Sequence, residues 1–456
     1  MGGIFMWLRK DSKMKIRLTG LMACLLLSAP SVSAADRFSE IDAEIDKANF
    51  TQEKTQKEYQ DFVFAYMAEY EHWRVEYLKE FDQYRAEIIK KWGVGDVSER
   101  HKHVEYFADK SVKTIIDYEN NEVSISIIVE QSLSDEEVKL ELTKQVEALV
   151  ANPDSSVSKV IAGVVPEAVE EVKITPVVFS VENEKQAKQV IIEQTKAQLR
   201  EIDKESDKTQ LTKTDSLSID IIEQVSIQKK KKLLAIAKER LVALADDYEK
   251  QRKQKTAKLT QKKIVEYKVA LPKNGLSSRA NAVIGFAEKE GEKWHISSAL
   301  IMAVIHSESS FDPKATSPIP AYGLMQIVPT TAGYDVNEIV RKISGPMSSG
   351  DLYLPNVNVE TGAAYLNILN KRYLKSIKND KSRFYCMIAA YNTGAGNVAK
   401  AFNLDGARNI RKAAKVINQM SPDEVYLHLL ENLPYEETKR YLKKVSGRIE
   451  LYQHKI

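Results

Sequence analysis

The feature that most constrains this chain is a wholly apolar run from Ala299 to Ile305 that ends close to a single carboxylate. Ser297 and Ser298 precede or open the run and offer hydroxyls that can cap a helix. Pro313 follows it and disfavours helical backbone at the residue before it. A helix that is apolar on all sides has to be surrounded by other elements. The pattern therefore predicts a buried helix that ends near Glu308.

Glu308 has an ordinary and a chemical interpretation. A glutamate at the end of a helix is usually a structural residue. A carboxyl group at the end of a buried apolar helix, however, loses its hydration, which raises its pKa and favours the protonated form. A carboxylic acid that stays neutral near pH 7 can protonate the oxygen of a glycosidic bond. Glu308 is therefore the candidate general acid, and the surrounding motifs decide between the two interpretations.

Five short motifs follow Glu308 in a fixed order. They are spelled ATS (315–317), AYGLMQIVP (321–329), NVNVETGAAYL (356–366), AAYNTG (389–394) and ETKRY (437–441). Each motif alone is weak, but five in sequence are highly specific. This series resembles the catalytic domain of soluble-lytic-transglycosylase-like enzymes, a mostly α-helical domain with a goose-lysozyme-like fold.

The resemblance implies an enzyme that acts on peptidoglycan without a cofactor. Lytic transglycosylases cleave the β-1,4 bond between N-acetylmuramic acid and N-acetylglucosamine without water. By this resemblance Glu308 first donates a proton to the leaving oxygen. It then takes the proton from the muramoyl C6 hydroxyl, which attacks C1 and gives a 1,6-anhydro sugar. One carboxylate suffices because the nucleophile belongs to the substrate, whereas an ordinary glycosidase needs two.

The same resemblance implies a set of substrate-binding residues. They are Ser317 beside the acid, Gly323, Leu324, Met325 and Gln326 in the loop at the −1 sugar site, Tyr391 and Asn392 across from Glu308, and Tyr365 and Tyr441 around them. For Tyr365 and Tyr441, a purely structural role as core aromatic residues is an equal alternative. Asp312, just before Pro313, is interpreted as a turn-capping residue rather than a second catalytic carboxylate.

Two other functions stay open at this point. A goose-type muramidase would use the same fold to hydrolyse the glycosidic bond and leave reducing ends. A cell-wall-binding periplasmic scaffold would keep the domain for binding and assemble through other parts of the chain. A Glu308→Gln variant separates the enzyme from the scaffold.

The first 35 residues have the pattern of a signal peptide. A charged segment begins at Met14, which is an alternative start, and Leu21 to Leu27 forms a short apolar segment. Small residues allow cleavage after Ala34 or Ala35. Cys24 is the candidate for lipidation, but too little apolar sequence precedes it. The pattern favours a cleaved, unlipidated periplasmic protein over a lipoprotein attached to the outer membrane.

The remainder predicts an α+β multidomain protein. Residues 36–92 form a long amphipathic helix with aromatic residues at steps of three and four, which packs on the next domain or on another copy of the chain. Residues 93–271 form an α+β domain that resembles the N-terminal domain of a membrane-bound transglycosylase, with a loop at 203–216. Strands are predicted at 104–107, 112–118, 123–129 and 264–271, and a capping box at 134–137 opens a helix. No chemistry is identified in this domain. Residues 276–456 form the catalytic domain.

Composition excludes some classes of partner. The net charge is +3 and basic residues alternate with acidic ones, which does not favour binding to nucleic acid. Lys229 to Lys232 is interpreted as a solvated basic run that opens a helix. His101 and His103 form a lone H-x-H pair, so a metal site is not expected. The expected partners are glycan strands of peptidoglycan, with the envelope machinery and self-association through the N-terminal helix as further options.

Overall fold

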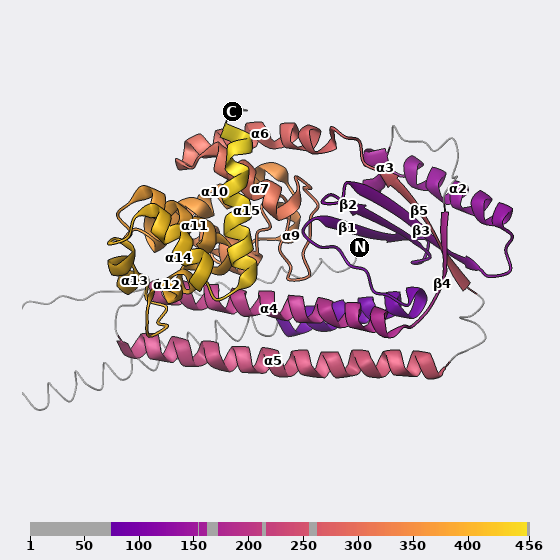
Figure 1. Cartoon of the computed structure of the whole chain (residues 1–456), viewed down its shortest axis with the longest axis horizontal. Coiled ribbons are helices and arrows are strands. Elements are labelled where there is room, and N and C mark those ends of the chain that lie inside the picture. The colour runs from indigo at the N-terminus through magenta and orange to yellow at the C-terminus, as the bar shows by residue number, and fades with distance from the viewer. Residues whose placement is uncertain (1–73, 154, 162–171, 212–215, 255–261, 454–456) are drawn as a thin grey trace, which may run out of the picture. The chain divides into compact units, whose positions relative to one another are not determined.

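The computed structural model describes residues 74–153, 155–161, 172–211, 216–254 and 262–453 (Figure 1). The chain divides into two compact units, Met1–Phe62 and Val63–Ile456, and every described residue belongs to the second unit. The predicted signal peptide, Cys24 and the first part of the predicted N-terminal helix lie outside the described residues. The predicted domain boundaries stay predictions.

The predicted N-terminal helix is present where the structure describes it, from residue 74 to Trp92. Gly93 ends it with a φ of +73°, and a Cβ at this position would lie 2.2 Å from the carbonyl oxygen of Val178. Only glycine fits this close approach. Ile88 and Trp92 are buried, so this side of the helix packs against the rest of the unit.

A five-stranded antiparallel sheet follows the helix. Its strands are β1 (Lys102–Phe107), β2 (Val112–Asp117), β3 (Glu122–Glu130), β4 (Val172–Pro176) and β5 (Lys262–Ala270), in the spatial order β1-β2-β3-β5-β4. The three predicted strands between Val104 and Val129 and the predicted closing strand are confirmed. Asn121 takes the left-handed conformation in the β2–β3 turn, with φ +56°, as an asparagine in a hairpin turn can.

Helix α2 (Asp135–Ala151) packs on this sheet and is followed by the short helix α3 (Ser156–Ile161). The predicted capping box is present: the Ser134 hydroxyl accepts from the backbone of Glu137, and the Glu137 carboxylate accepts from the backbone of Ser134. Val138 and Leu142 belong to the same apolar cluster as the strands.

Two long helices, α4 (Val181–Leu211) and α5 (Ser216–Lys253), lie between β4 and β5 in the chain. The predicted loop at 203–216 is wrong, because α4 continues to Leu211; residues 212–215 lie outside the described part. Asp203, Glu205, Ser206 and Asp207 are buried instead. Asp203 and Glu205 form ion pairs with distant cations.

The basic run Lys229–Lys232 was also misjudged. It lies inside α5 rather than at a helix start. Lys229 is buried, and its Nζ lies 3.1 Å from a Glu205 carboxylate oxygen. A helix pair with charges on its inner side explains both errors, because the sequence of one helix does not reveal the partner charges on the other.

The rest of the chain is helical (Figure 1). The elements are α6 (Gly275–Trp294), α7 (Ser298–Ser309), η1 (Pro329–Gly333), α8 (Tyr334–Val336), η2 (Asn337–Arg341), α9 (Ser349–Leu352), α10 (Pro355–Ile368), η3 (Leu369–Tyr373), α11 (Asp380–Thr393), α12 (Ala395–Phe402), α13 (Ile410–Ile417), α14 (Pro422–Asn432) and α15 (Glu436–Gln453), where η marks a π-helical turn. The predicted fold class, a helical C-terminal region after an α+β region, is confirmed. Within the described ranges, no helix is long and apolar enough to cross a membrane.

The packing of α2 on the sheet gives the first prediction. Leu142 is fully buried, whereas Leu140, on the other side of the same helix, is 73% exposed. Replacing Leu142 by alanine should lower the free energy of unfolding by ~2–5 kcal/mol, because the side chain leaves a cavity. Hydrogen exchange of the β3 amides would measure the loss. Leu140→Ala is the matched control, and an equal loss from both variants would contradict this packing.

Candidate active site

Helix α7 carries Glu308 on its last turn. Its apolar residues from Ala299 to Ile305 are all buried, as predicted. The helix ends after Ser309, because Ser310 and Phe311 take left-handed backbone conformations with φ +50° and +67°. The Ser309 hydroxyl donates to the carbonyl oxygen of Leu324 at 2.8 Å, which ties the helix end to the predicted substrate loop. The Glu308 side chain is only 5% exposed.

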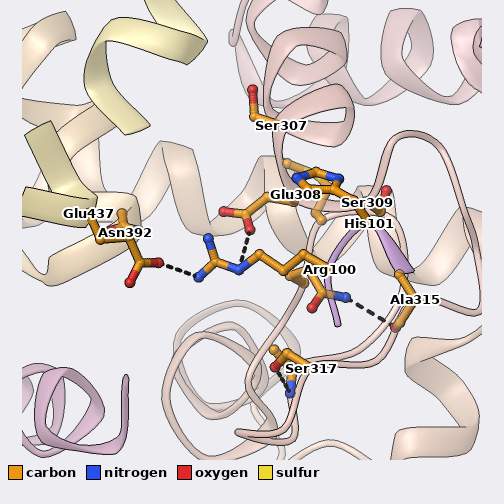
Figure 2. Close-up of polar contacts among 12 residues, drawn as sticks. Arg100, His101, Ser307, Glu308, Ser309, Ala315, Ser317, Asn392 and Glu437 are labelled. Carbon is orange, nitrogen blue, oxygen red and sulfur yellow. Dashed lines mark hydrogen bonds and ion pairs between the residues drawn. The ribbon is translucent and has the colours of Figure 1, made fainter. Parts of the chain in front are cut away.

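The surroundings of Glu308 set its proton affinity. Burial raises the pKa of the Glu308 carboxyl, while the Arg100 guanidinium and the Tyr441 hydroxyl oppose that rise. Arg100 Nε lies 3.6 Å from Glu308 Oε2 (Figure 2). On balance the pKa of Glu308 is raised, so this carboxyl group can still act as a general acid.

Glu437, on α15, is tied to the site by two arginines. Arg100 Nη2 lies 3.0 Å from one of its carboxylate oxygens, and Arg200 Nη2 lies 2.6 Å from the other. Burial alone would raise the pKa of Glu437, but the two guanidinium groups hold it below its usual value. Arg100 therefore bridges two carboxylates that come from different helices (Figure 2).

Arg100 belongs to the turn that precedes β1, and this turn docks onto the exit of α7. The ring nitrogen Nδ1 of His101 lies 3.0 Å from the Ser310 hydroxyl. His103 Nδ1 lies 3.7 Å from an Asp312 carboxylate oxygen. Burial lowers the pKa of His101 to about 4, so this histidine is neutral near pH 7. The H-x-H pair thus serves to dock the sheet beside Glu308.

Asp312 has the role predicted for it. Its Oδ1 accepts from the backbone N–H of Lys314 at 2.9 Å, which is a turn-capping contact. It is buried. Asp312 therefore holds the chain that leaves α7.

The loop from Gly323 to Gln326 is held by Asn358 of α10. Gly323 has a φ of +72°, and a Cβ there would lie 2.4 Å from the carbonyl oxygen of Leu352. The Asn358 side chain accepts from the backbone of Met325 at 2.8 Å and donates to the carbonyl oxygens of Tyr322 and Leu352. Asn358 is a positioning residue that the motif alone did not identify.

The predicted residues of this loop differ in their surroundings and in their hydrogen bonds. Leu324 and Met325 are fully buried in the apolar core of the C-terminal region. Gln326 uses its amide nitrogen to bind the carbonyl oxygens of Ala315 and Gly323, both at 3.0 Å. Its buried Oε1 has no partner among the described residues. Among the side chains of this loop, Gln326 therefore offers an unpartnered polar atom.

Two aromatic residues stand near the acid. The Tyr391 hydroxyl donates to the carbonyl oxygen of Met325 at 2.8 Å, and its ring lies 5.7 Å from that of Tyr365. Burial raises the pKa of Tyr391 and of Tyr441 well above the usual value, with the charge of Glu308 adding to the effect. Both phenols are therefore neutral hydrogen-bonding groups.

Some of the remaining predicted residues form hydrogen bonds elsewhere and not with Glu308. The Ser317 hydroxyl binds within its own loop, to the carbonyl oxygen of Ile319 and the N–H of Ala321, and Figure 2 shows it apart from the acid. The Asn392 amide oxygen accepts from the Thr438 hydroxyl at 2.8 Å. Among the described residues, no group of three or more His, Cys, Asp or Glu side chains is arranged to hold a metal ion.

Sequence reasoning did not find Arg100 and Arg200. Both lie more than 100 residues before Glu308, in a part of the chain where no chemistry was expected. The signal that could have suggested them is indirect: a buried acid and a second carboxylate need cations nearby.

The support that Asn358 gives to the loop is testable. Asn358→Ala would leave the Met325 N–H and the Leu352 carbonyl oxygen without these partners, and each orphaned group costs ~1–3 kcal/mol. The Tyr322 carbonyl oxygen would lose one of its two donors. We expect faster hydrogen exchange at residues 321–327 and a lower free energy of unfolding. Asn356→Ala is the control, because Asn356 is exposed on the same helix. Unchanged exchange in the Asn358 variant would show that the loop is held by other contacts.

Part of this chain is similar to known proteins. Residues 285–414 match the family described as "Transglycosylase SLT domain". Membrane-bound lytic murein transglycosylase C of Salmonella paratyphi B is 41% identical over 187 residues, which are 41% of this chain and 51% of that protein. The protein of the same name from Photorhabdus laumondii is 41% identical over 186 residues, with the same two shares.

Among solved structures, the lytic transglycosylase Slt of Pseudomonas aeruginosa is 28% identical; the match covers 38% of this chain and 24% of that chain, with a TM-score of 0.29. This chain spans about half the length of the curated relatives that it matches. The match of residues 285–414 to the transglycosylase SLT domain confirms, for the C-terminal region, the resemblance predicted from the motifs.

Proposed function

We propose that this protein is a peptidoglycan lytic transglycosylase that cleaves the MurNAc–GlcNAc β-1,4 bond and forms 1,6-anhydromuramoyl products. The observation that carries the proposal is the burial of a lone helix-end carboxylate, Glu308, inside the region that matches the SLT domain. Burial raises the pKa of Glu308, which supports the role of proton donor. The same group, once ionised, is the base for the muramoyl C6 hydroxyl.

The neighbouring residues support this chemistry in different ways. The Tyr391 hydroxyl donates its proton to the Met325 carbonyl oxygen, so its lone pairs can face the positive charge that develops on the sugar. The unpartnered Oε1 of Gln326 can accept from the N–H of an N-acetyl group. We assign Asn392, Tyr365 and Tyr441 to the walls around the sugar, and Ser317 to the shape of the neighbouring loop.

One observation favours a second candidate function. A hydrolytic glycosidase needs two carboxyl groups beside the bond, and Glu437 is a second carboxylate linked to Glu308 through Arg100. A goose-type muramidase is therefore the alternative, with Glu437 as the base that activates water. The products of the two reactions differ by the mass of one water.

The proposed substrate indicates where in the cell the protein acts. Peptidoglycan lies in the periplasm, and residues 1–35 have a signal-peptide pattern. The matched relatives are named membrane-bound, which supports a place at the envelope and leaves attachment to the outer membrane as an option. Glycan strands are the partner that the proposal requires, and envelope machinery or self-association would be additional.

Replacing Glu308 by glutamine tests the proposal directly. The variant keeps the size of the side chain but cannot cycle a proton, so muropeptide release from purified sacculi should fall by about 10²-fold or more while binding to sacculi persists. Mass spectrometry of the wild-type products should show anhydromuramoyl ends. Glu436→Gln is the control, because this carboxylate is 73% exposed.

Each other outcome selects another function. Products heavier by one water would establish the muramidase. Release that persists in the Glu308 variant would remove Glu308 from the chemistry. A folded protein that binds sacculi but releases nothing would favour the scaffold.

A further inference from the structure

In this structure the proposed acid is closed off by parts of the chain that lie outside the SLT match. The Glu308 side chain is 5% exposed, and Tyr391 and Tyr441 are 5% and 4% exposed. The turn that carries Arg100 contacts Glu308 directly, and helix α4 contacts the neighbouring Glu437 through Arg200. Helix α4 also contacts α11, α12 and η1. A glycosidic oxygen must come within ~2.6–3.2 Å of the acid that protonates it. In this structure the Arg100 guanidinium lies beside Glu308 Oε2 instead.

Helix α4 is held over this face by charged side chains at helical spacing. Arg200 pairs with Glu437, and Glu201 accepts from the Thr331 hydroxyl at 2.6 Å. Asp207 accepts from the backbone N–H of Gly396 at 2.7 Å, at the start of α12. Arg200, Asp203 and Asp207 are spaced by three and four positions, so they share one side of α4.

The end of α4 is fixed by an arginine of the C-terminal region. Arg408 lies 2.9 Å from an Asp203 carboxylate oxygen and 2.6 Å from an Asp207 carboxylate oxygen. Asp203 also accepts from Asn397 and Tyr435. Earlier along α4, the Gln194 amide donates to the carbonyl oxygen of Pro318 at 2.6 Å. The contacts between α4 and the C-terminal region therefore extend from the loop at Pro318 to the start of α12.

This contact can be released without destroying the C-terminal fold. The apolar core of the C-terminal region is formed by residues between 276 and 452, and none of its members comes from α4. Inside one chain, polar interfaces of this kind behave like transient ones, whereas apolar interfaces are permanent. Removing α4 exposes charged groups that water can solvate.

The Arg100 contact also opposes the proposed reaction. A carboxyl group that donates a proton has to be protonated, and a guanidinium at ion-pair distance stabilises the ionised form. Arg100 is shared between Glu308 and Glu437, so it occupies the position between the two carboxylates. The turn thus adds an electrostatic barrier to the steric one.

We propose that α4 and the Arg100 turn form an inhibitory latch that closes the SLT active site and has to open before a glycan strand binds. The latch consists of the Arg100 contacts with Glu308 and Glu437 and of the contacts of Arg200, Glu201, Asp203 and Asp207 with the C-terminal region. This inference rests on the proposed function.

The first test weakens the latch at its end. In the full-length protein, Asp203→Asn with Asp207→Asn removes the two charges that hold Arg408 and keeps the side-chain volumes. Release of muropeptides from sacculi should rise about tenfold or more, because turnover scales with the open fraction. Hydrogen exchange at residues 305–310 and 390–396 should become faster. Glu193→Gln, a half-exposed carboxylate on α4, is the control and should match the wild type.

The second test locks the latch. Glu201→Cys with Thr331→Cys allows a cleavable thiol cross-linker to join α4 to η1, since the two native side chains are in contact. The cross-linked protein should lose release, and reduction should restore it. The two single-cysteine variants, treated in the same way, control for modification alone.

Unchanged or slower release by the aspartate variant, or full activity of the cross-linked protein, would overturn the latch. If the wild type and all variants release no muropeptides, the proposed function has failed. Hydrogen exchange is then the remaining test of the latch. In that case, exchange in the aspartate variant equal to that of the wild type overturns it.

Discussion

The structure around the site depends on one physical problem, a carboxyl group at the end of a helix that is apolar on every side. Burying α7 provides the core of the C-terminal region, and it also removes water from Glu308. Such a group is tolerated only if it is protonated or if a cation compensates its charge. Here both occur in part: burial raises the pKa of Glu308, and Arg100 opposes that rise.

The compensation links regions that are far apart in the chain. Arg100 comes from the turn before β1, and Arg200, on α4, meets the same glutamate of α15. The sheet region, the long helices and the C-terminal helices are thereby joined at the proposed site. A region in which the sequence showed no chemistry thus contributes the guanidinium group that contacts the acid.

The local structure was largely predictable. The apolar run predicted α7 and its end, the strand-like segments between Val104 and Leu271 predicted β1, β2, β3 and β5, and the capping box at Ser134 predicted the start of α2. These features depend on neighbours a few residues away. The loop predicted at 203–216 was wrong because its carboxylates pair with Arg408 and Lys229, and no local pattern identifies partners at that distance.

The sequence by itself determined the candidate acid, the family motifs and the helical class of the C-terminal region, because these follow from residue types at short spacing. Tertiary structure alone decided which of the motif residues meet. It brings Tyr391 and Tyr441 near Glu308, keeps Ser317 within its own loop, and gives Gln326 one unpartnered oxygen. It also decided that Glu308 is buried and ion-paired, because burial and ion pairing are properties of the assembled elements and not of any one segment.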